Sequence, residues 1–413
     1  MEIIQTIMEK SDVYEAQQRL AATVHHTTLQ HSLTFSNLCG NEIYLKPENL
    51  QKTGSFKVRG AYNKISKLSE TTKLKTVVAS SAGNHAQGVA YAAAERGIEA
   101  IIVMPQSTPI AKVTATQNYG AKVVLHGDYY DDAYNKALEI TKEKNAVFIP
   151  PFDDEDIIAG QGTVALEMLE DEPDLDAIIV PAGGGGLLAG VAFAVKQISP
   201  KTKVIGVQAE RANAIVQSFE AKKRICSDNI FTIADGIAVK NPGIITVDLI
   251  NKYVDEMHTV TDDEIASTII HLIERTKMIV EPAGATSLAL ALSGKLKEKN
   301  KKVACLLSGG NIDVGFMNKI IEKGLVSRGR QMKFSVVLTD KPGALSDFSK
   351  IMSANNANII SVQYDRMSTE IHLNETILHI ACEVGGFEHG KKVLSNLAKH
   401  GYKVTLNSDT VSK

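Results

Sequence analysis

Short apolar runs rich in β-branched residues alternate with helix-like stretches between about residues 40 and 325. The runs that predict strands are Thr76–Ala79, Ala100–Met104, Lys122–Leu125, Ala177–Val180, Lys203–Val207 and Lys302–Leu307. Stretches such as Leu187–Val195, which follows one of these runs, predict helices. Strands that alternate with helices form parallel sheets with helices on both faces. This part of the chain is therefore predicted to be an α/β fold.

The remainder of the chain follows a different pattern. Residues 326–332 lie in a polar, basic stretch that is typical of an exposed linker. Beyond it the pattern predicts strand, helix, strand, strand, helix and strand over Lys333–Leu338, Ala344–Asn355, Asn358–Tyr364, Thr376–Val384, Glu388–His400 and Tyr402–Leu406. This βαββαβ order is ferredoxin-like. The sequence thus predicts two domains, residues 1–325 and 333–413.

Length and charge narrow the choice of partners. A chain of 413 residues is long enough for more than one domain. Its 45 Lys and Arg residues nearly balance 47 Asp and Glu residues, and the two signs are interleaved, so no charged surface is predicted that would attract nucleic acid or a membrane. The apolar runs are also much shorter than the roughly 18 residues of a spanning helix. We expect small molecules and other subunits as partners, with no nucleic acid and no membrane.

The cysteines indicate the compartment. Cys39, Cys226, Cys305 and Cys382 are scattered and show no CxxC spacing. This distribution argues against a disulfide framework or a zinc knuckle, and it fits a reducing environment. We therefore expect a cytoplasmic protein.

One lysine stands at an unusual place. In the stretch TGSFKVRGA, Gly54 and Ser55 predict a turn and an N-cap, which puts Lys57 in the first turn of a helix. Helix N-termini carry partial positive charge, so an ammonium is disfavoured there and a neutral amine or an imine is tolerated better. Lys57 is accordingly a candidate Schiff-base nucleophile and base. Taken alone, a lysine at this position would much more simply be a solvent-facing residue on an amphipathic helix, and only the other motifs favour the catalytic interpretation.

A run of glycines follows one of the predicted strands. In IIVPAGGGGLLAG, residues Gly183 to Gly186 lie between an apolar strand and an apolar helix, and such a loop presents backbone amides to a phosphate. A purely structural turn is the simpler alternative. Gly184, Gly186 and Ala189 also match the G-x-G-x-x-G/A dinucleotide pattern, with Glu210 as a candidate ribose ligand. An NAD(P)-dependent oxidoreductase is therefore the alternative from a different enzyme class.

Two further polar loops follow predicted strands. The first is SSAGNHAQG, residues 80–88, which could supply amides to a carboxylate and a side-chain amide to a ring hydroxyl. The second is LLSGGN, residues 306–311, and EPAGA precedes it at residues 281–285. Loops that follow parallel strands lie at the edge of the sheet where open α/β proteins bind ligands. One lysine, one phosphate loop and two polar loops fit a single cofactor.

The four blocks TGSFKVRGA, SSAGNHAQG, AGGGGLLAG and SGGN, in this order, resemble the threonine (serine) dehydratase group of the tryptophan-synthase-β-like pyridoxal 5′-phosphate (PLP) enzymes. The resemblance covers residues 20–325. It implies two open α/β subdomains, the smaller at roughly residues 50–150 and inserted in the larger. It also implies that L-threonine is converted to 2-oxobutanoate and ammonia, with L-serine as a secondary substrate that gives pyruvate.

The resemblance also implies roles for single residues. Lys57 would bind PLP as a Schiff base and then take the Cα proton, Phe56 would pack on the ring, Asn84 would bond the ring hydroxyl, and Ser308 would face the pyridine nitrogen. The predicted cofactor-binding residues are Phe56, Lys57, Asn84, Gly183, Gly184, Gly185, Gly186, Leu187, Glu281 and Ser308. The loop predicted to take the substrate carboxylate contains Ser80, Ser81, Gly83, Asn84 and His85.

Several departures within this superfamily bear on the reaction. A serine that precedes the Gly83-Asn84 pair in serine racemase is Ala82 here, which has no proton to give, so racemisation is disfavoured. The acidic residues of that relative's cation site correspond to Gln208 and Ala214, so no metal is expected. A catalytically inactive amino-acid sensor of the same fold is the third alternative, which the intact site residues disfavour.

The C-terminal region resembles an ACT regulatory domain. The turn into its first helix is DKPGAL, and the resemblance implies an amino-acid effector, isoleucine or valine, near Asp340, Pro342, Gly343, Ala344 and Leu345. Free amides after a proline can meet a carboxylate. A dimerisation module without ligand is the alternative. We expect a homotetramer or homodimer, and leave isoleucine biosynthesis and threonine degradation open.

Overall fold

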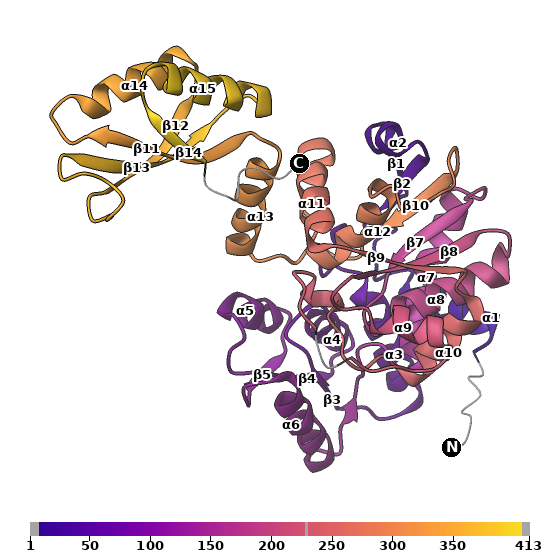
Figure 1. The fold of residues 1–413 in the computed structure, drawn as a ribbon. Coiled ribbons are helices and arrows are strands. Elements are labelled where there is room, and N and C mark those ends of the chain that lie inside the picture. Colours follow the sequence, from indigo (N-terminus) through magenta and orange to yellow (C-terminus); the bar gives the residue numbers. More distant parts are fainter. Residues whose placement is uncertain (1–7, 228–229, 407–413) are drawn as a thin grey trace. The chain divides into compact units, whose positions relative to one another are not determined.

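The structure is a computed structural model that describes residues 8–227 and 230–406 (Figure 1). The contacts between residues divide the chain into two compact units, one that extends to Ile312 and one that begins at Asp313. The outer ends of the two predicted domains, residues 1 and 413, lie outside the described residues. Each unit is described by itself below.

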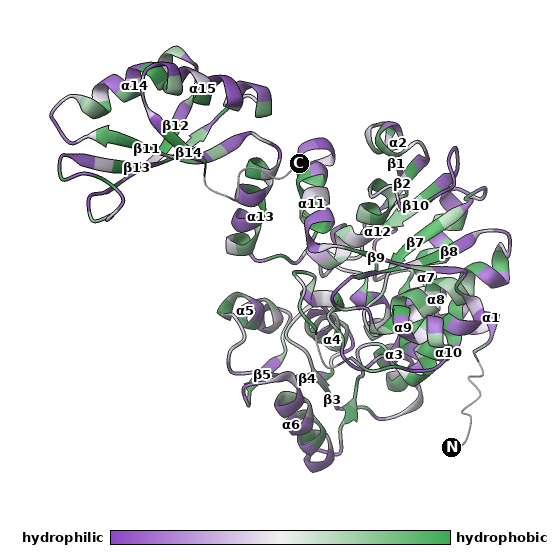
Figure 2. Ribbon diagram, in the orientation of Figure 1, coloured by the Kyte–Doolittle hydropathy of each residue, from purple (hydrophilic) through white to green (hydrophobic). Residues whose placement is uncertain are grey.

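A mostly parallel sheet organises the first unit. Its strands are β1 (Gln30–His31), β2 (Glu42–Lys46), β7 (Ala177–Pro181), β8 (Lys203–Ala209), β9 (Glu256–Val260) and β10 (Lys302–Leu306). They lie in the order β1-β2-β10-β7-β8-β9, and only the β1–β2 pair is antiparallel. Figure 2 shows β7 and β10 largely in the colour of hydrophobic residues, as expected for strands covered on both faces.

A second parallel sheet lies within residues 76–148. It consists of β3 (Thr76–Ser80), β4 (Glu99–Met104), β5 (Lys122–Leu125) and β6 (Val147–Phe148), in the order β5-β4-β3-β6. Its core is built from alanine, valine and isoleucine side chains of β3, β4 and the helices around them. The α/β class predicted from the alternation of strands and helices is confirmed.

Helices cover both sheets of the first unit. They are α1 (Lys10–Leu20), α2 (Leu33–Cys39), η1 (Glu48–Leu50), α3 (Lys57–Thr71), α4 (Asn84–Glu95), α5 (Ile110–Asn118), α6 (Tyr130–Glu143), α7 (Glu155–Asp171), α8 (Gly186–Ile198), α9 (Ala214–Ala221), η2 (Asp235–Ile237), α10 (Ile244–Tyr253), α11 (Asp262–Thr276) and α12 (Pro282–Leu292). In the described ranges, no helix combines the length and the apolar character needed to cross a membrane.

Glycines allow three of these helices to approach closely. A Cβ at Gly160 on α7 would lie 2.7 Å from the Cα of Gly60 on α3. A Cβ at Gly190 on α8 would lie 2.3 Å from the carbonyl oxygen of Ile158 on α7. Real Cβ atoms do not approach backbone atoms so closely. Helix α7 can therefore pack this tightly against α3 and α8 only because Gly160 and Gly190 carry no side chain.

The second unit is an antiparallel sheet with helices. Its elements are α13 (Val314–Ser327), β11 (Gln331–Thr339), α14 (Ala344–Ala354), β12 (Asn358–Asp365), β13 (Glu375–Glu383), α15 (Phe387–Lys399) and β14 (Lys403–Leu406). The strands lie in the order β12-β13-β11-β14. Every second residue of β11, from Met332 to Leu338, is buried. The predicted βαββαβ arrangement is confirmed.

The connection between α13 and β11 is shorter than the predicted linker. Helix α13 continues to Ser327 and β11 begins at Gln331, so only residues 328–330 lie outside both elements. Met332, the last residue of the predicted linker, is buried in the core of the second unit. Arg328 and Arg330 lie in this short connection, whereas Ser327 ends α13 and Gln331 begins β11, and composition alone does not locate these two ends.

The close contact between α7 and α8 leads to a stability prediction. Gly190→Ala places a methyl group against the carbonyl of Ile158, and the backbone of α7 must shift. We expect the free energy of unfolding to fall by about 1 to 3 kcal/mol, the usual cost of overpacking. Chemical denaturation of the purified variant measures the change. Unchanged or higher stability, as a glycine-to-alanine exchange gives in an open helix, would contradict the contact.

Candidate active site

Lys57 is the first residue of α3, as the motif predicts. Gly54 takes a positive φ of 71° and makes the turn that precedes the helix. The N-cap is Phe56 and not Ser55, which corrects the expectation. Ser55 instead forms a β-bridge with Gly309, and the N–H of Phe56 donates to the carbonyl of Ser308 at 3.2 Å. These contacts hold the start of α3 beside the loop that follows β10.

The amine of Lys57 is held by a neutral partner. The side chain is half-buried, and Nζ donates a hydrogen bond to the carbonyl oxygen of Pro151 at 2.8 Å. Desolvation lowers the pKa of Lys57 to about 8, and the charge of Glu281 opposes this shift. A lysine with such a pKa carries a usable fraction of neutral amine near neutral pH. Pro151 lies in the chain just before α7, and no sequence motif points to its role.

Asn84 joins the other loops to this lysine. Its Nδ2 donates to Oε1 of Glu281 at 2.7 Å, and its Oδ1 accepts from Nδ2 of Asn311 at 2.8 Å. Asn311 also donates to the carbonyl of Thr53 at 2.8 Å. Three polar loops that are distant in sequence thus meet at one amide. Asn311 ends the SGGN motif, but no role was predicted for it.

Glu281 is a buried carboxyl at this meeting point. Burial raises its pKa to about 8, and the nearby charge of Asp235 adds to the shift. The hydrogen bond from Asn84 and the positive charges of Lys112 and Lys57 act in the opposite direction. Lys112 and Asp235 form an ion pair at 3.0 Å. Neither residue of this pair, which lie in α5 and η2, belongs to a motif that the sequence pattern singles out.

The glycine run connects β7 to α8, as predicted. Gly185 is the N-cap of α8 and has a positive φ of 100°. A Cβ at Gly184 would lie 2.3 Å from the ring of Phe152, and one at Gly183 would lie 3.1 Å from the Cα of Ile237. The first N–H groups of a helix have no partner within it, so the start of α8 offers free donors to an anion.

The loop predicted to take the substrate carboxylate leads from β3 into α4. The hydroxyl of Ser81 accepts from the N–H of Gly83 at 3.2 Å, and Nε2 of His85 lies 2.9 Å from the carbonyl of Ile149. Desolvation and the charge of Lys57 lower the pKa of His85 to about 3, so its imidazole is neutral. His85 is thus a packed, hydrogen-bonded residue.

The residues around Lys57 suit a phosphorylated aldehyde of aromatic character. Besides the amine and the free donors at α8, the buried hydroxyls of Thr53, Ser55 and Ser80 have no hydrogen-bond partner among the residues that the structure describes. Ser308 is also buried where β10 ends. Buried polar groups that protein atoms leave unpaired commonly serve a bound group. The donor set therefore fits PLP, which combines a phosphate, a ring with polar substituents and an aldehyde.

Other predicted residues lie apart from this set. Glu210 follows β8 and is exposed. Gln208 is buried in β8, and its Oε1 accepts from the N–H of Val216 at 3.0 Å, while Ala214 begins α9. In the part of the chain that the structure describes, no three His, Cys, Asp or Glu residues gather as a candidate metal site. That no metal is required remains a prediction.

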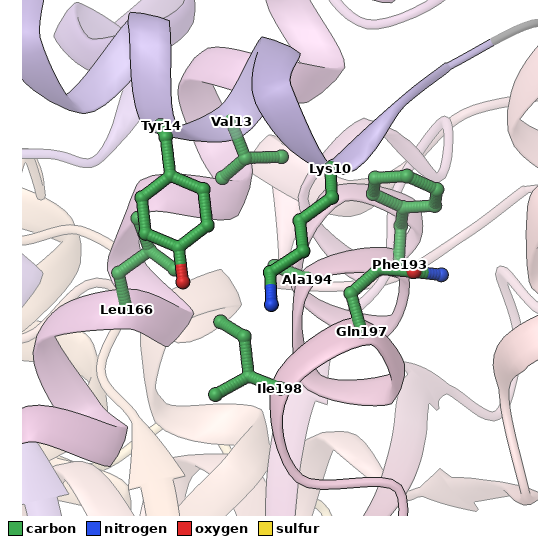
Figure 3. Close-up of a pocket in the computed structure, with 8 residues that line it drawn as sticks. All are labelled: Lys10, Val13, Tyr14, Leu166, Phe193, Ala194, Gln197 and Ile198. Atoms are coloured by element: carbon green, nitrogen blue, oxygen red, sulfur yellow. The ribbon is translucent and has the colours of Figure 1, made fainter.

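A hollow in the first unit, shown in Figure 3, lies elsewhere. It is lined by Lys10, Val13, Tyr14, Leu166, Phe193, Ala194, Gln197 and Ile198. These residues come from α1, α7 and the C-terminal half of α8, whereas the glycine run is at the N-terminal end of α8. This hollow therefore does not belong to the site around Lys57.

The second unit has an open hollow where α14 begins. It is lined by Asp340, Lys341, Pro342, Gly343, Leu345, Ser346, Tyr364 and Arg366. Nε of Arg366 pairs with Oδ2 of Asp340 at 2.9 Å, and the guanidinium also faces the ring of Tyr364. Four of the five predicted effector residues line the hollow, and the fifth, Ala344, is the first residue of α14.

Known proteins resemble this chain over most of its length. An L-threonine ammonia-lyase of Thermotoga maritima is 47% identical over 395 residues, which cover 96% of this chain and 98% of that protein. The structure of the processed form of threonine deaminase isoform 2 from Solanum lycopersicum matches with a TM-score of 0.72 at 36% identity, over 76% of this chain and 94% of that one. The structure of maize serine racemase matches with a TM-score of 0.73 at 36% identity, over 78% and 98%.

The family comparison agrees with the geometry around Lys57. Residues 20–309 match the family model described as "Pyridoxal-phosphate dependent enzyme". The match spans both parallel sheets, the glycine run and the polar loops, and it ends just after Ser308. The chain belongs to this family of pyridoxal-phosphate dependent enzymes.

Proposed function

We propose that this chain is a threonine ammonia-lyase that converts L-threonine to 2-oxobutanoate and ammonia with PLP as cofactor. L-Serine is a secondary substrate and gives pyruvate. The observation that carries the proposal is Lys57, an amine of lowered pKa at the start of α3, held within a set of polar loops that fits PLP. The near full-length similarity to a threonine ammonia-lyase supports the choice of reaction.

PLP, when bound, supplies the electron-withdrawing ring that weakens the Cα–H bond of the amino acid and permits loss of its β-hydroxyl. Lys57 would hold the cofactor through its aldehyde, and its amine, freed when the substrate amine takes its place, would accept the Cα proton on Nζ. The carbonyl of Pro151 orients that nitrogen without adding a negative charge, so the amine is not locked in its protonated form. Lys57 thereby acts first as nucleophile and then as base.

The surrounding residues orient the cofactor and the substrate. Asn84 is fixed between Glu281 and Asn311, which leaves one N–H of its amide for the ring hydroxyl. Free N–H groups at Gly183 to Leu187 bind the phosphate, and Ser308 faces the pyridine nitrogen. The loop from Ser80 to His85, with the start of α4, binds the substrate carboxylate.

The same site disfavours racemisation. The fold does not decide between the two reactions, because a serine racemase shares it. Ala82, which precedes Gly83, has no proton to deliver to Cα. The neutral hydroxyl of Ser308 cannot hold a proton on the ring nitrogen as a carboxylate would, so a long-lived carbanion is discouraged and early loss of the β-hydroxyl is favoured.

We further propose that the second unit is an ACT-like regulatory domain. Its confirmed βαββαβ fold and the hollow beside Asp340 support binding of an amino-acid effector, isoleucine or valine. An effector on one unit can alter turnover on the other only if the two are coupled, and symmetric assembly is a common means. A homotetramer or homodimer in the cytoplasm is the expected form.

Loss of the lysine amine tests the proposed reaction. In Lys57→Ala we expect 2-oxobutanoate formation from L-threonine to fall by at least about 10² to 10⁴-fold, because a positioned proton-transfer group contributes this much. Lys52→Ala removes an exposed lysine of the same segment and should keep wild-type turnover. The assignment would be wrong if Lys57→Ala retained appreciable activity while remaining folded.

The lowered pKa of Lys57 gives a pH prediction. The rate at which the cofactor-free enzyme binds PLP should rise with pH and level off above about pH 8, since only the neutral amine reacts and its pKa is about 8 instead of 10.5. Stopped-flow absorbance over a range of pH values measures this rate. Reaction of PLP with Nα-acetyl-lysine serves as the control, and a midpoint near that of the control would contradict the environment described for Lys57.

The hollow of the second unit is tested by effector binding. We expect isoleucine or valine to bind the wild-type protein, and Asp340→Ala to raise the dissociation constant about tenfold, as loss of a charged hydrogen bond would. Glu388→Ala removes an exposed carboxylate of α15 and should leave binding unchanged. Isothermal titration calorimetry measures all three. If both variants bound the effector with equal affinity, the hollow beside Asp340 would not be the effector site.

A further inference from the structure

A network of buried charges surrounds Arg59, two residues after Lys57. Arg59, Lys46 and Glu48 are fully buried, and Glu167 is nearly so. Nε and Nη2 of Arg59 donate to Glu48, both at 2.8 Å, and Nη1 and Nη2 donate to Glu167 at 2.6 and 2.9 Å. One planar guanidinium thus makes two bidentate pairs, the most directional ion-pair geometry that a side chain offers.

Further bonds connect this network to its surroundings. Nη1 of Arg59 donates to the hydroxyl of Thr163 at 3.2 Å, and Nζ of Lys46 donates to Oε2 of Glu167 at 2.5 Å. The partners come from β2, η1, α3 and α7. Two positive and two negative side chains balance formally. Because loss of one partner would leave a buried charge unpaired, the network resists any shift of α3 along α7.

The helices joined in this way carry the two ends of the proposed cofactor site. Helix α3 begins at Lys57 and packs on α7 where Gly60 meets Gly160. Helix α7 also packs against α8, and α8 begins at Gly186 in the glycine run. The separation between the lysine amine and the phosphate donors is therefore set across α7.

We propose that Arg59 is a positioning residue that fixes this separation by holding α3 on α7. The inference rests on the proposed function, in which Lys57 and the glycine run bind opposite ends of one PLP molecule. When PLP binds, the Lys57 nitrogen bonds to the aldehyde carbon, and the aldehyde oxygen leaves as water. A ligand bonded to Lys57 and also held by its phosphate is sensitive to the separation of these two ends, whereas a ligand that forms no bond to Lys57 is much less so.

The experiment compares two probes on the cofactor-free enzyme. PLP uses both ends of the site, and pyridoxine 5′-phosphate, which has an alcohol in place of the aldehyde, keeps the phosphate and ring contacts but forms no bond to Lys57. Arg59→Lys keeps the positive charge but cannot form two bidentate pairs. Equilibrium dialysis should show the dissociation constant of PLP at least tenfold higher in Arg59→Lys, while that of pyridoxine 5′-phosphate changes less than twofold.

Two further variants keep the test decisive. Thr163→Val removes one acceptor of Arg59 and keeps every charge, so it should raise the constant for PLP about threefold even if Arg59→Lys does not fold. Ile65→Ala is the control for a general loss of stability in α3. Ile65 is fully buried in the hydrophobic core around β3 and β4, away from the charges that surround Arg59. This variant should lower the thermal stability without changing the ratio of the two dissociation constants.

The outcomes separate this inference from the proposed function. A parallel rise for both probes, or no rise for PLP in Arg59→Lys and Thr163→Val, would overturn the positioning role. If the wild-type enzyme bound both probes equally, Lys57 would not be reacting with the aldehyde. In that case the proposed function would fail, and the inference with it. A ratio that changed equally in Ile65→Ala would reduce Arg59 to a general stabiliser of α3.

Discussion

The site depends on a lysine amine that is desolvated without a tightly paired carboxylate. A comparison with Lys46, in the same unit, makes this clear. Lys46 is buried against Glu167 at 2.5 Å in an ion pair, whereas the amine of Lys57 bonds to the carbonyl of Pro151. The groups nearest to Lys57 follow the same constraint: His85 is neutral and the pKa of Glu281 is raised to about 8. Each therefore adds little charge that would fix the protonation of the amine.

Many of the strands and helices could be predicted because each depends on a local pattern of residues. Apolar runs located strands such as β3, β7 and β10, and the period-2 alternation of β11 located the sheet of the second unit. The glycine run and the position of Lys57 at a helix start were equally local. By contrast, β2 and β9 were not predicted, since each mixes polar residues with its apolar ones.

The remaining features could not be predicted because they depend on residues far apart in sequence. Asn311 reaches Asn84 across 227 positions, and Pro151 reaches Lys57 across 94. Arg and Glu are residue types that usually lie at the surface, and only the tertiary structure shows that Arg59 and Glu167 form a buried ion pair. The connection after α13 is shorter than the predicted linker, because composition does not show where a helix ends and a strand begins.

The balance of charges around Arg59 matters for Lys57 as well as for packing. Two buried positive and two buried negative groups form the network around Arg59, which lies two residues from the lysine, in a region where charge is poorly screened. A net positive charge there would lower the pKa of the amine further, and a net negative charge would raise it. Because the four charges cancel formally, the network can hold α3 rigidly and leave the protonation of Lys57 to its own surroundings. The network around Arg59 fixes the position of α3. The protonation of Lys57 is governed instead by its hydrogen bond to the carbonyl of Pro151 and by Glu281, whose pKa is raised.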